Sequence, residues 1–267
     1  RLKIFSYLPN PRVWKAVIAG KICGVEVEVI GDKASELGLW LWGFRPKRLD
    51  KDDLKAAQRL RRKARRGLSG DLYKTDSFME THPFGTLPAA FSSDGTVGIF
   101  ESNSILRAVA RIGKESSLYG KNHYEASRID SFLDANLVFA REAQVYLLDC
   151  ESLSNEGYNR MAMAYEFYAY GIEASLKNNC YIAGESLSIA DISFACDFSQ
   201  FLREGHYAER LRDQGFDLIT QNFNSDYPRT HEHLLLLAEK EEFSSVFGSY
   251  LDRFKKRVSK ERLAEQQ

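Results

Sequence analysis

The fold of this chain is decided by GTLPAAF at residues 85–91, which is followed by VGIF at 97–100 and ESNSI at 101–105. The first two segments are short and apolar, as expected for neighbouring strands. A proline cannot donate a hydrogen bond to a sheet, so Pro88 must lie where no such bond is missed. If the Leu87–Pro88 peptide bond is cis, the backbone of Leu87 turns outward and can pair with an extended peptide ligand.

The third segment, ESNSI, predicts the start of a helix. Free N–H groups and the positive end of the helix dipole gather at such a point, and Ser102 and Asn103 lie there. A ligand carboxylate is well received at this position. Glu101, which comes just before, can pair with a ligand ammonium group. Together the segments predict a site for an acidic peptide.

The residues before this stretch open with a β-α-β pattern. A loosely alternating strand at 2–7, a helix at about 12–23 and a strictly alternating strand at 25–30 follow one another, which implies a parallel strand pair. Asp94-Gly95 is a strong hairpin signal between the two later strands. We therefore predict a first α/β domain over residues 1–113, with a mixed four-stranded sheet and a basic insertion at about 31–75.

After Gly113 the pattern changes to long helices, and we predict an all-helical second domain over residues 122–267. Within it, Ser188-Ile189-Ala190-Asp191 matches the capping box, in which Ser188 and Asp191 each bond the other's backbone N–H at a helix start. The chain is long enough for two such domains.

Charge is balanced over the chain but not along it. Thirty-seven basic residues match thirty-seven acidic ones, so the net charge predicts no polyanionic partner. Residues 45–66 nevertheless carry eleven Lys or Arg against three Asp. No aromatic residues interleave them, so stacking partners for single-stranded nucleic acid are missing. We interpret this segment as a solvated insertion helix rather than a nucleic-acid contact.

Other global features point to a soluble intracellular protein. No apolar run approaches the roughly twenty residues that span a bilayer, so we expect no membrane partner. The four cysteines are widely spaced without a metal-binding pattern, so we expect buried thiols, no metal site and a cytoplasmic location.

These motifs together resemble the glutathione transferases, and the resemblance covers nearly the whole chain apart from the insertion. It implies a thioredoxin-like first domain with a cis-proline at Pro88, and glutathione as co-substrate. In that family an acidic-Ser pair contacts the γ-glutamyl end, which corresponds here to Glu101-Ser102, and the backbone before the proline corresponds to Leu87. The capping box of the helical domain corresponds to Ser188 and Asp191.

Two branches of the family show local similarity. Residues 5–16 and 97–105 resemble the transferase-like module of the translation elongation factor one gamma subunit. Asn10-Pro11-Arg12-Val13-Trp14-Lys15 also resembles the opening of bacterial glutathione-dependent β-etherases, which have a serine in the place of Asn10. The two resemblances imply different functions.

Glutathione's thiol must become a thiolate to act as a nucleophile, and the loop after the first strand is where the sulfur would arrive. Asn10 can donate through its amide, while Arg12 and the helix N-terminus add positive charge that lowers the thiol pKa. Tyr7 is the rival donor. The alternative is that Asn10 only caps the helix, a role that Asn fills well.

A substrate pocket is less defined by the sequence. Trp40 and Trp42 can line such a pocket or fix the insertion to the core, with nothing to choose between the two. Tyr124 and Arg128 have a spacing that places them on one face of a helix, where they can border an acceptor pocket or pack between domains.

The resemblance implies a transferase or lyase in which the glutathione thiolate attacks a small hydrophobic aromatic electrophile. If the β-etherase similarity holds, the reaction cleaves β-aryl ether bonds of lignin-derived aromatics and releases a phenol. The alternative is a non-catalytic interaction module like the elongation-factor subunit. The family implies a homodimer, or a heterodimer with a related chain, through the helix at 122–150.

Overall fold

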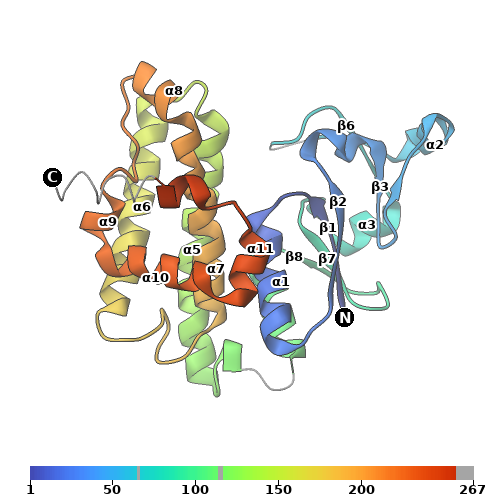
Figure 1. Cartoon of the computed structure of the whole chain (residues 1–267). Helices are drawn as coiled ribbons and strands as arrows, with labels where there is room; N and C mark the ends of the chain where they lie inside the picture. Colours follow the sequence, from blue (N-terminus) through green and yellow to red (C-terminus); the bar gives the residue numbers. More distant parts are fainter. Residues whose placement is uncertain (65–66, 114–116, 257–267) are drawn as a thin grey trace. The chain divides into compact units, whose positions relative to one another are not determined.

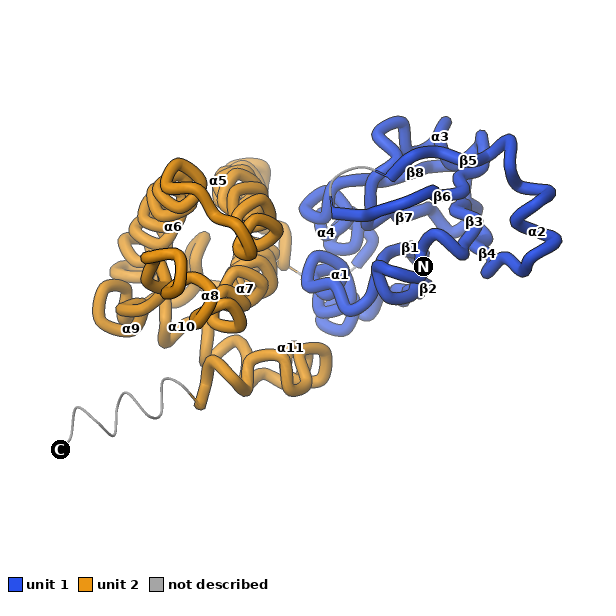
Figure 2. Tube along the Cα trace, turned by 90° about the horizontal axis from the view of Figure 1, so that it is seen from above, with its two compact units in different colours: residues 1–115 blue, residues 116–267 orange. Residues whose placement is uncertain are grey.

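The computed structural model describes residues 1–64, 67–113 and 117–256. The chain divides into two compact units, Arg1–Glu115 and Ser116–Gln267, which are described separately below (Figure 2). None of the helices within the described ranges is both long and apolar enough to cross a membrane. Nor do these ranges contain a group of three or more His, Cys, Asp or Glu side chains that could hold a metal ion.

The first unit is built around a mixed four-stranded sheet with the order β2-β1-β7-β8 (Figure 1). β1 pairs in parallel with β2 and antiparallel with β7, and β7 pairs antiparallel with β8, so the predicted β-α-β unit and hairpin are confirmed. The elements of this layer are β1 (Leu2–Tyr7), α1 (Pro11–Cys23), β2 (Val27–Asp32), α3 (Asp76–Thr81), β7 (Ala89–Phe91), β8 (Gly98–Phe100) and α4 (Ser102–Ile112).

Strand β2 begins two residues later than the sequence predicted. Gly24 adopts the left-handed conformation (φ 68°) at the end of α1, and the N–H of Val25 donates to the carbonyl of Gly20 at 2.9 Å. Val25 therefore still belongs to the helix cap, which leaves the sheet to start at Val27.

The basic segment forms the predicted insertion helix only in its middle part. Within residues 45–66, α-helix and 3-10 helix cover residues 51–60, whereas two short strands, Lys47–Arg48 and Arg61–Lys63, belong to a second four-stranded sheet with the order β4-β3-β6-β5. Its cations are partly neutralised at the surface, because Arg48 pairs with Asp32 and Glu36, and Lys47 with Asp53. The elements are η1 (Ala34–Leu39), β3 (Trp40–Trp42), β4 (Lys47–Arg48), α2 (Lys51–Ala56), η2 (Ala57–Leu60), β5 (Arg61–Lys63) and β6 (Asp71–Lys74).

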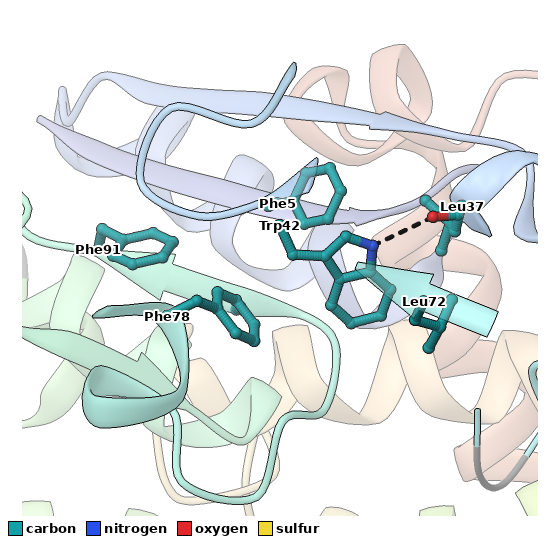
Figure 3. Packing of buried hydrophobic residues seen from close by; sticks show 7 residues of the cluster. Phe5, Leu37, Trp42, Leu72, Phe78 and Phe91 are labelled. Carbon is teal, nitrogen blue, oxygen red and sulfur yellow. Dashed lines mark hydrogen bonds between the residues drawn. The ribbon is translucent and has the colours of Figure 1, made fainter. Parts of the chain in front are cut away.

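The two sheets of the first unit share one hydrophobic core. Trp42 from β3 is fully buried, its ring lies 5.6 Å from that of Phe5 in β1 and 5.8 Å from that of Phe78 in α3, and its indole N–H donates to the carbonyl of Leu37 at 3.2 Å (Figure 3). The prediction that Trp42 lines a substrate pocket is therefore wrong. Its bulk instead fixes the insertion to the core, the alternative that the sequence left open.

The second unit is helical, and α5, α6 and α7 pack against one another (Figure 1). The predicted capping box is confirmed at the start of α7, where the Asp191 carboxylate accepts from the backbone N–H of Ser188 and of Ile182, both at 2.9 Å. His233 lies 2.8 Å from the same carboxylate. The elements are η3 (Ser117–Tyr119), α5 (His123–Asp149), α6 (Asn155–Leu176), α7 (Ile189–Phe201), η4 (Leu202–Tyr207), α8 (Ala208–Asp213), α9 (Phe223–Asp226), α10 (Pro228–Glu239) and α11 (Glu241–Phe247).

Candidate functional site

The N-terminus of α4 is the centre of the candidate site. Glu101 precedes it with φ 65°, a positive value that is uncommon for a residue with a side chain, and its carboxylate does not cap the helix. Ser102 and Asn103 are the first two helical residues, and both side chains are buried. The predicted helix start is confirmed, and Glu101 places one exposed carboxylate beside it without capping it.

A buried lysine that the sequence analysis missed lies under this helix start. The Nζ atom of Lys15, from α1, donates to the Oγ of Ser102 at 3.1 Å and to the Oδ1 of Asn103 at 2.8 Å. Only 1% of Lys15 is exposed. The sequence does hold a signal, since Lys15 shares the apolar face of α1 with Ile18 and Ala19. Its partners, 87 and 88 residues away, are not visible in the pattern.

The segment before β7 supplies extended backbone. The Leu87–Pro88 bond is cis, as the sequence suggested. In the described part of the chain, the backbone of Leu87 makes no hydrogen bond, because pairing of β7 with β1 starts at Ala89. An extended ligand can therefore pair with Leu87 without displacing a strand.

The second sheet holds the loop that leads to this segment. Lys74, in β6, donates from Nζ to the carbonyl of Gly85 at 2.7 Å and lies 4.7 Å from the centroid of the Trp42 ring. Gly85 has φ 59°, and a Cβ there would meet Nζ of Lys74 at 3.0 Å. A glycine is required for this conformation, and the insertion thereby fixes the course of the chain two residues before Leu87.

His82 contacts strand β7, which directly follows the Leu87–Pro88 segment. Its imidazole is stacked on Phe78, with ring centroids 4.9 Å apart, and its Nε2 lies 3.0 Å from the carbonyl oxygen of Ala90 in β7. Burial lowers the pKa of His82, so the ring is neutral at physiological pH.

The prediction that Asn10 donates to the glutathione thiol is wrong. Asn10 is fully buried, and its Oδ1 accepts from the backbone N–H of Arg12 at 3.0 Å, which caps α1. Its Nδ2 donates to the buried Oγ of Ser6 at 3.0 Å. A fully covered amide with both ends bonded has no surface for a ligand, so the capping alternative holds. Tyr7 and Arg12 are half-buried and stay candidates for contact with sulfur.

The remaining predicted pocket residues fall into both units. Trp40 is half-buried and donates from Nε1 to the Oδ2 of Asp32 at 3.1 Å. In the second unit, Tyr124 is 90% exposed, and the guanidinium of Arg128 lies 4.8 Å from the centroid of the Phe132 ring. It stays a prediction that an acceptor pocket is lined by Trp40, Tyr124 and Arg128.

Comparison with solved structures assigns the fold. A glutathione S-transferase from Rhodospirillum rubrum F11 superposes with a TM-score of 0.61 over 93% of this chain and 92% of that one, at 15% identity. The ternary complex of BphK, a bacterial transferase, gives 0.63 over 93% and 98%, also at 15% identity. This chain has the glutathione transferase fold. Its thioredoxin-like first unit and helical second unit are the two parts of that fold.

Comparison with curated sequences finds a different set of relatives. Probable elongation factor 1-gamma 1 of Arabidopsis thaliana is 24% identical in an alignment 256 residues long, which covers 92% of this chain and 49% of that protein. Elongation factor 1-gamma of Trypanosoma cruzi is 31% identical in an alignment 150 residues long, which covers 54% of this chain and 33% of that protein. This chain spans less than half the length of these relatives, and no family model matches it.

Proposed function

We propose that the first unit binds glutathione, with its γ-glutamyl end at the start of α4. The observation that carries this proposal is the Ser102 hydroxyl, which is buried at an uncapped helix N-terminus. Its one hydrogen bond within the described residues comes from a lysine. The γ-glutamyl carboxylate accepts from this hydroxyl and from the backbone N–H groups, and its ammonium group pairs with Glu101.

The cysteinyl part of glutathione extends from this end along Leu87. Its backbone amide and carbonyl pair with the unbonded backbone there, as a short added strand would. This arrangement leaves the thiol near the start of α1, the third element of the proposed site.

The bound thiol serves a transferase reaction on a small hydrophobic aromatic electrophile. The N-terminus of α1 and the guanidinium of Arg12 favour the thiolate, and Tyr7 is the remaining hydroxyl donor close in sequence. The thiolate attacks carbon, a thioether forms and the leaving group departs with the bonding electrons. Cleavage of a β-aryl ether, with a phenol released, is the narrower form of this reaction. It loses its main support, since Asn10 cannot stand in for the β-etherase serine.

Titration calorimetry with glutathione tests binding directly. The variant Ser102→Ala should raise the Kd about tenfold or more, because it removes a donor to a carboxylate. Ser104→Ala, which changes a half-buried serine two residues further along α4, is the matched control and should leave the Kd unchanged. Equal Kd values for wild type and Ser102→Ala would refute this placement.

Turnover is tested with 1-chloro-2,4-dinitrobenzene, a hydrophobic aromatic electrophile, and with a β-aryl ether model compound. Formation of a thioether from the first supports a transferase. Release of a phenol from the second would establish the narrower reaction. Binding without turnover of either would leave glutathione as a ligand and contradict the transferase reaction.

A second candidate function is an interaction module, which the exposed apolar side chains of the second unit favour. Met163, Phe167 and Tyr170 recur at helical spacing on α6 and are 68–74% exposed, and Val138 on the neighbouring α5 is 61% exposed. Exposed apolar side chains gathered on one face indicate a protein partner, either a second copy or a related chain. Light scattering tests this: Phe167→Asp should reduce the mass from dimer to monomer, and Glu166→Ala, its polar neighbour, should not.

A further inference from the structure

The ammonium group of Lys15 determines which atom donates and which accepts in its hydrogen bonds to Ser102 and Asn103. An ammonium group has three donors and no acceptor. In its contact with Ser102 at 3.1 Å, the serine Oγ must therefore be the acceptor. The same holds for the contact with Asn103 at 2.8 Å, where Oδ1 accepts.

The consequence for Ser102 is that its single O–H proton points away from Lys15. No acceptor for this proton exists among the described residues, and the serine is 93% buried. A buried donor without an acceptor lowers the stability of the folded protein. Such a donor therefore indicates that a bound ligand supplies the acceptor.

Lys15 also orients the amide of Asn103. Because its Oδ1 accepts from Lys15, its Nδ2 is directed away from the lysine, as a donor. The Ser102 hydroxyl is thus the side-chain donor that lacks an acceptor at the start of α4. The backbone N–H groups of the helix start have the same polarity, and a buried cation lies one hydrogen bond behind them.

We propose that Lys15 is a positioning residue that sets the Ser102 hydroxyl as a donor and thereby makes this end of the site selective for a carboxylate. The ligand group that fits is the γ-glutamyl α-carboxylate of glutathione, so the inference rests on the proposed glutathione site. Lys15 does not touch this carboxylate. It acts through Ser102 and through its charge, which is poorly screened where water is excluded.

The test compares two ligands on three proteins. Glutathione and its analogue 4-aminobutyryl-cysteinylglycine, which lacks only the γ-glutamyl α-carboxylate, are titrated by calorimetry into wild type, Lys15→Met and Lys21→Met. Methionine fills the apolar volume of the lysine stem without its charge or donors. Lys21 is an exposed lysine on the same helix and serves as the matched control.

For wild type and Lys21→Met, glutathione should bind at least tenfold more tightly than the analogue. For Lys15→Met, the Kd of glutathione should rise about tenfold while that of the analogue stays unchanged, so the preference disappears. A role of Lys15 in packing alone would weaken both ligands equally. Tryptophan fluorescence checks that each variant is folded; if Lys15→Met is not, Lys15→Gln takes its place, with the same loss of preference expected.

The outcomes separate this inference from the proposed function. If wild type binds glutathione but Lys15→Met keeps the full preference, or loses affinity for both ligands equally, the role of Lys15 is overturned and the glutathione site stands. If wild type binds neither ligand, the proposed function itself is overturned, and the role of Lys15 with it.

Discussion

Replacement of Asn10 by alanine separates a structural role at the start of α1 from a catalytic one. The side chain is fully buried and makes two hydrogen bonds, from Nδ2 to Ser6 and from the backbone N–H of Arg12 to Oδ1. Asn10→Ala removes both bonds. We therefore expect a loss of stability in the first unit and little change in glutathione affinity.

The magnitude follows from these two bonds. Loss of an N-cap side chain costs about 1 kcal/mol, and up to about 2 kcal/mol in proteins. The buried Ser6 hydroxyl loses its donor, which costs about 1–2 kcal/mol more. The free energy of unfolding should thus fall by about 2–4 kcal/mol. The double variant Ser6→Ala/Asn10→Ala has no Ser6 hydroxyl left without a donor. Its loss in the free energy of unfolding should therefore be smaller than the sum of the two single losses.

Urea unfolding followed by tryptophan fluorescence measures this loss specifically. The chain has three tryptophans, Trp14, Trp40 and Trp42, and all lie in the first unit, so the signal reports on that unit. Glutathione affinity is measured by calorimetry without urea, where the variant remains folded. Its Kd should stay within about twofold of the wild-type value.

One result would refute the reasoning. If Asn10→Ala unfolds at the same urea concentration as wild type but loses glutathione turnover, the amide acts on the thiol and not on the helix. The double variant adds a second check, because strictly additive losses would mean that the contact between Asn10 and Ser6 contributes nothing.

Three further predictions concern stability. Gly98→Ala should cost about 1–3 kcal/mol in the same urea assay, because its Cβ would lie 2.3 Å from the carbonyl oxygen of Thr81, a backbone atom that cannot move aside. Burial lowers the pKa of His82, so the unfolded state binds more protons; the first unit should lose stability as pH falls below about 6.5, and His82→Gln should flatten this slope. Burial raises the pKa of Glu204, so the folded state holds its proton longer; the second unit should lose stability as pH rises past about 4.5, and Glu204→Gln should remove that loss in urea unfolding followed by circular dichroism.

The sequence predicted the elements whose signals are local. The strand alternation at the chain start and the Asp94-Gly95 turn depend on neighbouring residues alone, and so does the capping box of Ser188 and Asp191. Each is therefore readable without knowledge of the rest of the fold.

The helix predicted for the basic segment is wrong at both ends of that segment, because the signal there is not local. Its Lys, Arg, Ala and Leu residues favour a helix, yet Arg61–Lys63 pair as β5 with β6, at Asp71–Lys74. Pairing with a strand further along the chain outweighed the local preference. Lys15 was missed on the same ground, because only the folded structure brings it to Ser102.

In the proposed site, binding and activation of glutathione would rest on different residues of this unit, so the two could be lost separately. The carboxylate end depends on α4 and on Lys15 in the middle of α1. The proposed thiol end depends on the start of α1, where the Asn10 amide caps the helix and Arg12 and Tyr7 are the candidates for contact with sulfur. An enzyme and a binding module with this fold would share the first set and differ in the second. Retention on a glutathione column therefore cannot tell them apart, whereas turnover can. The residues to vary for that purpose are Arg12 and Tyr7, which leave the carboxylate end intact.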